Sequence, residues 1–183
     1  MNNSSPAVFL DRDGVLVQPV LRDGKISSPR NEAEFALIPN LRQPLMALAK
    51  DSFLLFVITN QPDLARKHLM PETLAAFHHR LIYMAGGTAV IRKIYVCPHD
   101  DCAACTCRKP APGMILQAAQ EWNVDLKLSY MIGDREVDMQ AGKAAGCKTV
   151  LISADYNQQV RADFVAGDLA GAARWIHEDR LHP

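Results

Sequence analysis

The sequence has no excess of either charge, because 20 lysine and arginine residues balance 20 aspartate and glutamate residues. Proteins that bind nucleic acid through a generally basic surface gain affinity by displacing counterions from its phosphates. This chain offers no global basic excess of that kind. We therefore expect no nucleic-acid partner.

Long hydrophobic runs are also missing. No apolar stretch approaches the roughly 18 to 20 residues that a membrane-spanning helix needs. The opening residues, MNNSSP, lack the basic flank and the apolar segment of a secretory signal. We expect a cytoplasmic protein without a membrane partner.

Repeats, low-complexity tracts and a linker between domains are absent as well. Hydrophobic residues make up 49% of the 183 residues and charged residues 22%, which is the ordinary balance of a globular protein. A chain of this length can bury roughly 70% of its unfolded surface. We expect residues 1–183 to form a single domain.

Short apolar runs that stop abruptly at polar residues recur along the chain and predict buried strands. Three of these runs stop at Asp11, at Thr59 and at Gly133-Asp134. The expected strands are residues 7–10, 53–58, 94–96, 129–132 and 148–152.

The segments between the strands have helical spacing of apolar residues. One stripe, expected to face the core, consists of Leu74, Phe77, Leu81 and Met84. The expected helices begin at Pro71, at Pro112, at residue 135 and after Asp168 as a cap. Alternation of strands and helices of this length predicts parallel crossovers, and hence a three-layer α/β fold around a mainly parallel sheet.

Residues 18–34 are polar and contain Pro19, Gly24 and Pro29, which predicts a loop over the ends of the strands. Loops on a rigid scaffold commonly carry functional contacts. We expect this loop to act as a lid that faces the substrate.

The polar residues that follow the strands converge in an open parallel sheet, because the ligand crevice lies at the carboxyl ends of the strands. This places Asp11, Asp13, Thr59, Asn60 and Asp134 together. Two carboxylates about 4 Å apart repel by roughly 4 kcal/mol at an effective dielectric near 20, so three of them call for a cation. Oxygen ligands favour Mg²⁺.

Four of the five cysteines, Cys97, Cys102, Cys105 and Cys107, lie within eleven positions, beside His99. In a reducing compartment such a cluster indicates a metal before disulfides. Cys97, His99, Cys105 and Cys107 offer three thiolates and one imidazole, a suitable tetrahedral set for Zn²⁺. Cys102 could replace one of these ligands, and free cysteines are the alternative interpretation.

Four motifs in order along the chain resemble those of the haloacid dehalogenase (HAD) superfamily of phosphohydrolases. They are DRDGVL at residues 11–16, Thr59, Lys109, and Gly133-Asp134 with Asp138. Within that superfamily the stretches VITNQ, CPH followed by CRKPAPGM, and MIGDREVDMQAG resemble the group of heptose bisphosphate and histidinol-phosphate phosphatases. The resemblance covers roughly residues 7–152. It implies a Rossmann-like HAD fold, which we expect to lack a large cap domain.

The resemblance also implies Mg²⁺-dependent hydrolysis of a phosphomonoester through an aspartyl phosphate. Asp11 is then the nucleophile. Asp13 protonates the leaving oxygen and later deprotonates water. The metal ligands are the Asp11 carboxylate, the backbone carbonyl of Asp13 and the Asp134 carboxylate. Thr59 and Lys109 bind the oxygens of the phosphoryl group.

Further residues flank this expected site. Asn60, Arg108 and Arg135 are expected to bind the rest of the substrate, with solvated surface charge as the alternative for the two arginines. Asp138, four residues after Asp134 and on the same helical face, is expected to support the site rather than bind the metal. Strand-end turns and helix caps are the alternative interpretation of the acidic residues.

The related phosphatases have a CxH…CxC zinc site at the position of the cysteine cluster. Only residues 100–104 separate the two ligand pairs here, a shorter segment than the group leads us to expect. Four protein ligands leave zinc no open position, so we expect a structural role for the loop 97–107. Because Arg108 and Lys109 follow Cys107 directly, the zinc site would hold the phosphate-binding lysine in place.

The substrate implied by the resemblance is a small phosphorylated sugar. D-glycero-D-manno-heptose 1,7-bisphosphate, hydrolysed at its 7-phosphate, is favoured, with histidinol phosphate or another sugar phosphate as the alternative. A receiver-like switch that carries a phosphorylated aspartate is the alternative from a different class. Such a switch needs no second acid–base group, so Asp13 favours an enzyme. We expect a monomer.

Overall fold

A six-stranded parallel sheet forms the centre of the protein in a computed structural model that describes residues 4–101 and 103–181. The strand order is β5-β4-β1-β6-β7-β8. The strands are β1 (Ala7–Leu10), β4 (Leu54–Asn60), β5 (Ile91–Cys97), β6 (Tyr130–Gly133), β7 (Lys148–Ile152) and β8 (Phe164–Ala166).

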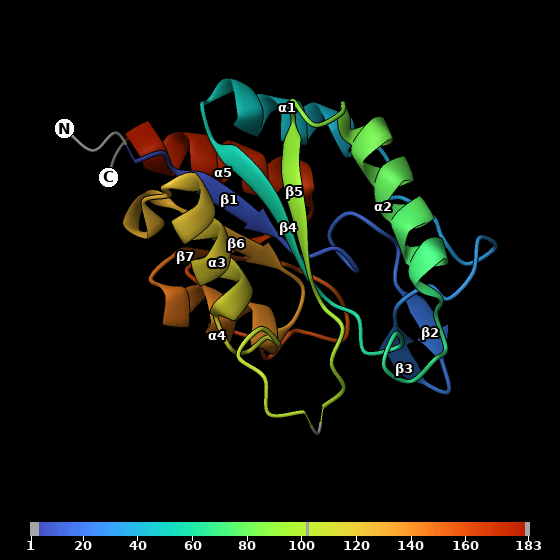
Figure 1. The fold of residues 1–183 in the computed structure, drawn as a ribbon. Helices are drawn as coiled ribbons and strands as arrows, with labels where there is room; N and C mark the ends of the chain where they lie inside the picture. The colour runs from blue at the N-terminus through green and yellow to red at the C-terminus, as the bar shows by residue number, and fades with distance from the viewer. Residues whose placement is uncertain (1–3, 102, 182–183) are drawn as a thin grey trace.

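Helices cover both faces of the sheet (Figure 1). One face packs against α1 (Arg42–Lys50), α2 (Pro71–Ala85) and α5 (Leu169–Leu181), and the other against α3 (Gly113–Trp122) and α4 (Glu136–Ala145). A 3₁₀ helix, η1 (Leu126–Leu128), precedes β6. Successive residues of a strand point to opposite faces, so Leu55 and Val57 pack into one core and Phe56 into the other. The predicted three-layer α/β fold is confirmed.

The central position of β1 brings three strand ends side by side. Leu10 is in register with Val57 of β4 on one side and with Ile132 of β6 on the other. Just beyond this row, the backbone N–H of Asp11 donates to the carbonyl of Ile132 at 2.9 Å. The chain runs from β1 to β4 and β5 on one side and then crosses back to β6 on the other side of β1. Open α/β sheets form their ligand crevice at such a reversal of strand order.

The segment expected as a loop at 18–34 instead contains a short antiparallel hairpin, β2 (Val20–Arg22) and β3 (Lys25–Ser27). Asp23 and Gly24 occupy its tip with φ of 51° and 72°. A two-residue turn with positive φ at both positions suits the twist of a hairpin, and Asp-Gly is its usual sequence. The Asp-Gly pair was the available signal for this hairpin.

Three other elements were not predicted: helix α1, the short 3₁₀ helix η1 and the edge strand β8. The α1 segment has Pro44 near its start, and proline is tolerated in a first helical turn. Three α1 residues are buried, namely Pro44, Leu45 and Leu48. Leu45 and Leu48 follow buried Leu41 at spacings of four and three residues, so an amphipathic pattern was the available signal for this helix.

The prediction of the α2 core stripe is wrong for one of its four residues. Leu74, Phe77 and Leu81 are buried, but Met84 is 49% exposed and Ala85 takes the next inward position. With 3.6 residues per turn, the inward face moves on by four residues after Leu81 instead of three.

Among residues 4–101 and 103–181, none of the helices has both the length and the apolar composition of a membrane span.

Candidate active site

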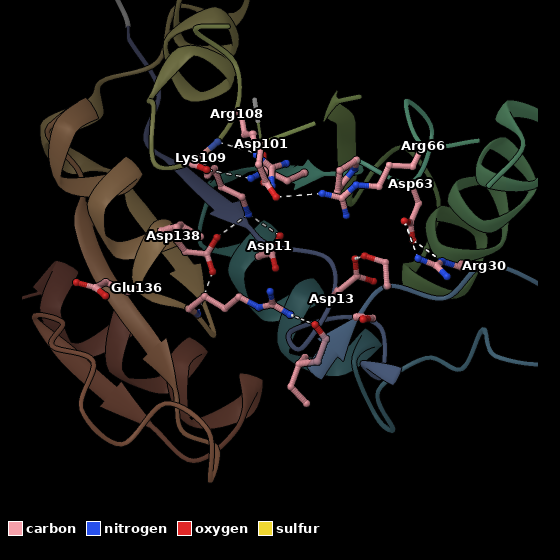
Figure 2. Close-up of a pocket in the computed structure, with 17 residues that line it drawn as sticks. Asp11, Asp13, Arg30, Asp63, Arg66, Asp101, Arg108, Lys109, Glu136 and Asp138 are labelled. Carbon is pink, nitrogen blue, oxygen red and sulfur yellow. Dashed lines mark hydrogen bonds and ion pairs between the residues drawn. The ribbon is translucent and has the colours of Figure 1, made fainter. Parts of the chain in front are cut away.

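The carboxyl ends of β1 and β4 open into a pocket of about 460 Å³ (Figure 2). Hairpin β2-β3, the loop after β4, the segment before α3 and the start of α4 complete its walls. Six predicted site residues line it, namely Asp11, Asp13, Asn60, Arg108, Lys109 and Arg135. Two others, Thr59 and Asp134, are fully buried and connect to the site through neighbouring side chains.

A buried ion-pair network joins Lys109 to two carboxylates. Its Nζ lies 2.6 Å from Asp11 Oδ1 and 2.6 Å from Asp138 Oδ1, and donates to the carbonyl of Ile58 at 2.9 Å. Burial alone would lower the pKa of Lys109, but the two carboxylates outweigh it and raise that pKa. Lys109 is therefore a permanent cation beside Asp11.

The Asp11 carboxyl group has a strongly shifted acidity. Burial raises its pKa to about 8, against the opposing attraction of Lys109, and the nearby Asp138 and Asp134 raise it further. Proton loss from a buried carboxylic acid among other carboxylates is unfavourable without a second cation. The site is therefore short of positive charge.

Three carboxylates provide a place for that cation. Single oxygens of Asp11, Asp134 and Asp138 all lie within 4.8 Å of one another. Burial raises the pKa of Asp134 to about 6, and its Oδ1 has no hydrogen-bond partner among the described residues. Both Asp138 oxygens are used, one by Lys109 and one by the backbone N–H of Arg135 at 3.0 Å. The oxygen donors left by Asp11 and Asp134 suit Mg²⁺.

Asp13 is held by donors from three segments. Arg12 donates through Nε at 3.0 Å and Nη2 at 2.9 Å, Ser28 through its hydroxyl at 2.7 Å, and Gln61 through Nε2 at 3.0 Å. Arg12 is fully buried. Four hydrogen bonds fix the Asp13 carboxylate in the pocket. Sequence reasoning missed these partners, although Gln61 stands two residues after Thr59 in the VITNQ stretch.

The two residues at the end of β4 mainly contact other protein groups. Asn60 donates to the carbonyl of Lys109 at 3.0 Å and accepts from its backbone N–H at 3.1 Å. Thr59 accepts from Gln61 at 2.9 Å. Asn60 thereby fixes the backbone of Lys109, while the substrate contacts expected of Asn60 and Thr59 stay predictions.

Asp134 depends on the segment that follows β7. The hydroxyl of Tyr156 donates to Asp134 Oδ2 at 2.5 Å. The amide of Asn157 donates to the backbone carbonyls of Asp134 at 2.7 Å and Ile152 at 2.8 Å. Sequence reasoning missed both residues because they lie in an irregular segment with no periodic pattern.

The two predicted substrate-binding arginines lie on the pocket wall. Arg108 donates to the carbonyl of His99 at 3.3 Å and pairs with Asp101. Arg135 donates to the carbonyl of Ile26 at 3.1 Å, which joins the start of α4 to hairpin β2-β3. The predicted lid segment therefore does reach the pocket, by this contact and through Ser28.

The four predicted zinc ligands gather at the end of β5. Cys107 Sγ lies 2.8 Å from Cys97 Sγ, 3.6 Å from Cys105 Sγ and 3.2 Å from His99 Nδ1. Zinc–sulfur bonds of 2.3 Å in a tetrahedron would separate the sulfur atoms by about 3.8 Å. The cluster therefore has nearly the size of a zinc site. The alternative ligand, Cys102, lies outside the described residues.

Comparison with known proteins connects this site to named relatives. The HAD-hydrolase-like family model matches residues 106–172. A D-glycero-D-manno-heptose-1,7-bisphosphate 7-phosphatase from Thermosynechococcus vestitus is 32% identical, over 93% of this chain and 95% of the relative. The chain belongs to this phosphatase family. A Bordetella bronchiseptica member, named for the beta anomer of the same heptose, is 35% identical over 94% of this chain and 98% of the relative.

Solved structures agree with the family assignment. The Bordetella bronchiseptica D,D-heptose 1,7-bisphosphate phosphatase, crystallised with magnesium and phosphate, superposes with a TM-score of 0.81 at 30% identity. The alignment covers 95% of this chain and 99% of that structure. The enzyme of the same name from Burkholderia thailandensis, 23% identical with a TM-score of 0.64, shares the fold over 94% of this chain and 98% of its own. The predicted HAD resemblance is confirmed.

The raised pKa values of Asp11 and Asp134 predict that Mg²⁺ stabilises this protein more at pH 8 than at pH 6. Protons held by these carboxyls must leave before a metal binds. In the metal-free protein, the folded pKa values lie above the unfolded value of 3.8, so stability falls as pH rises from that value through about 6 for Asp134 and about 8 for Asp11. Thermal unfolding with and without Mg²⁺ at the two pH values measures the difference. Asp134→Asn should lose most of the stabilisation, and an equal effect at both pH values would contradict the prediction.

Proposed function

We propose that this protein is a Mg²⁺-dependent phosphatase that removes the 7-phosphate from D-glycero-D-manno-heptose 1,7-bisphosphate. The observation that carries the proposal is a buried Asp11 paired with Lys109 at the end of β1, with Asp13 two residues on, in a pocket lined by arginines. Relatives that bear the name of this activity match nearly the whole chain.

In the first half-reaction, a carboxylate oxygen of Asp11 attacks the phosphorus atom. The bond from phosphorus to the sugar oxygen breaks, and Asp13 gives that oxygen its proton. Water then attacks the aspartyl phosphate, Asp13 takes the proton from this water, and inorganic phosphate leaves. Mg²⁺ held by Asp11 and Asp134 would offset the repulsion between carboxylate and phosphate.

Protein groups prepare both steps. Lys109 places a permanent positive charge beside the attacking carboxylate and can pair with a phosphoryl oxygen. Arg12, Ser28 and Gln61 hold the carboxyl group of Asp13 in one position, so the same oxygen atoms face the leaving group in the first step and water in the second. A site already arranged in this way needs little reorganisation during the reaction.

The pocket wall favours a bisphosphate over the alternative substrates. Guanidinium groups form strong paired hydrogen bonds with phosphate. Histidinol phosphate would instead bring a cationic amine toward them. A receiver-like switch requires no pocket of this kind for the body of a substrate. That the enzyme is a monomer stays a prediction.

We also propose that Cys97, His99, Cys105 and Cys107 hold one structural Zn²⁺. The four donor atoms all lie within 4.8 Å of one another, and the segment leads directly into Arg108 and Lys109. A zinc ion that ties the end of β5 to Cys107 would limit the movement of this lysine.

Asp11→Asn should abolish phosphomonoester hydrolysis with an unchanged fold, because an amide cannot attack phosphorus. Asp13→Asn should lose about 10² to 10⁴-fold in turnover while still forming a phosphoenzyme from a substrate with a good leaving group. Steady-state kinetics, mass spectrometry of the intact protein and thermal unfolding measure these effects. Wild-type rates in folded Asp11→Asn protein would rule out this mechanism.

Carefully reduced protein should contain about one equivalent of Zn²⁺ by metal analysis. Structural zinc can contribute about 10 kcal/mol or more to forming its site, so chelation or Cys105→Ser should lower Tm markedly. Cys147→Ser, which changes a buried cysteine outside the cluster, is the matched control and should retain zinc. Loss of zinc in Cys102→Ser but not in Cys105→Ser would show that Cys102 is the ligand.

Arg108→Ala and Arg135→Ala should each reduce kcat/KM for the heptose bisphosphate by roughly 10 to 150-fold, mainly through KM. A hydrogen bond between charged groups contributes about 1.5 to 3 kcal/mol. A small aryl phosphate has no second phosphate for these arginines to bind and should be affected little. Arg174→Ala, at an exposed site on α5, controls for the change in net charge. Equal losses on both substrates would place the arginines at the reacting phosphoryl group instead.

A further inference from the structure

A negatively charged side chain lies on the arginine-lined wall of the pocket. Asp101, from the short segment between the two pairs of cysteine-cluster residues, lies in the pocket among the arginines (Figure 2). Its carboxylate accepts from Arg66 Nη2 at 3.0 Å and also pairs with Arg108. One carboxylate thus bridges two of the guanidinium groups that line the pocket.

This bridge differs from the ion pair that Asp63 and Arg30 form in the same pocket. Asp63 is 5% exposed and binds Arg30 through two hydrogen bonds, at 2.8 and 2.9 Å. The Asp101 side chain is 67% exposed. Exposed ion pairs contribute little net stability, because water screens them and the side chains lose freedom. The Asp101 carboxylate can therefore be exchanged for another anion, whereas the Asp63 pair is part of the framework.

Both guanidinium groups keep a second anchor when Asp101 moves away. Arg108 donates to the carbonyl of His99 at 3.3 Å. Arg66 forms a two-pronged ion pair with Asp100, donating through Nε at 3.0 Å and also through Nη2. Departure of Asp101 would thus leave Arg66 paired with Asp100 and Arg108 bonded to the His99 carbonyl. Each guanidinium group would then have an N–H released at the position that Asp101 had occupied.

We propose that Asp101 is a specificity-determining residue, an internal counterion that occupies the position taken by the non-reacting phosphate of the substrate. The proposal rests on the proposed function, since it concerns how that pocket selects a bisphosphate. A phosphate dianion carries more charge than a carboxylate and matches two guanidinium groups better, so it displaces Asp101. A neutral or weakly charged substrate body does not, and meets an occupied site.

Asp101→Asn tests the proposal, since it removes the charge and keeps the shape. KM for the heptose bisphosphate should fall about twofold to fivefold, the effect of losing one exposed competing ion pair. Values of kcat for this substrate, and both constants for 4-nitrophenyl phosphate, should stay unchanged. Glu136→Gln is the matched control, because Glu136 lines the same pocket but accepts a hydrogen bond from Gln140 on α4.

Two outcomes would overturn the proposal. A rise in KM would mean that Asp101 orients the arginines for the substrate, and an equal fall in Glu136→Gln would mean that only the total charge of the pocket matters. Zinc content and Tm confirm that each variant is folded, and Asp101→Ala is measured alongside in case the asparagine disturbs the loop.

The role of Asp101 can also be tested if the proposed substrate is wrong. If the wild type cleaves 4-nitrophenyl phosphate but not the heptose bisphosphate, the proposed function fails. Inhibition of aryl phosphate cleavage by fructose 1,6-bisphosphate then tests Asp101 independently. Its inhibition constant should fall about twofold to fivefold in Asp101→Asn, and an unchanged or higher constant would overturn the proposal.

Discussion

The contact between Lys109 and Asp11 is the interaction on which the rest of the site depends. Asp11, Asp134 and Asp138 are all buried at one end of the sheet, where water cannot screen their mutual repulsion. The ammonium of Lys109 lies between two of them, at 2.6 Å from each. Arg135 adds a more distant contact, 3.9 Å from Asp134. These two cations do not balance three carboxylates, and a divalent metal ion would supply the missing positive charge.

The position of Lys109 follows from the sheet and from the loop that precedes it. Asn60 at the end of β4 is in register with Cys97 at the end of β5, so the cysteine cluster begins beside the residue that fixes the Lys109 backbone. The loop leaves the sheet at Cys97 and returns to it at Lys109. A zinc ion bound at the cysteine cluster and the side-chain amide of Asn60 would therefore both restrict the position of Lys109.

Local sequence patterns predicted the strands because both faces of the sheet are buried, and such strands read as continuous apolar runs, as in β1. The ends of these runs located Asp11 and Asp134 for the same reason. Ser28 and Tyr156 could not be found in this way, since each reaches the site from an irregular segment whose path depends on tertiary contacts. Helix α1 is a different case, since Leu41, Leu45 and Leu48 have helical spacing and were an available signal that went unused.

The positively charged side chains of the pocket differ in burial, and we expect them to differ in function. Lys109 is 4% exposed and cannot leave its carboxylates, which suits a group that must be in place before the reacting phosphoryl group arrives. The guanidinium groups on the pocket wall are more exposed, and their bonds to backbone carbonyls keep them directed inward whichever anion they bind. A phosphate transferred deep in the site therefore meets fixed charge, while the rest of the substrate exchanges with ions that the protein already holds. Chemistry and selectivity can thus change independently, since altering a loop residue such as Asp101 leaves the buried network intact.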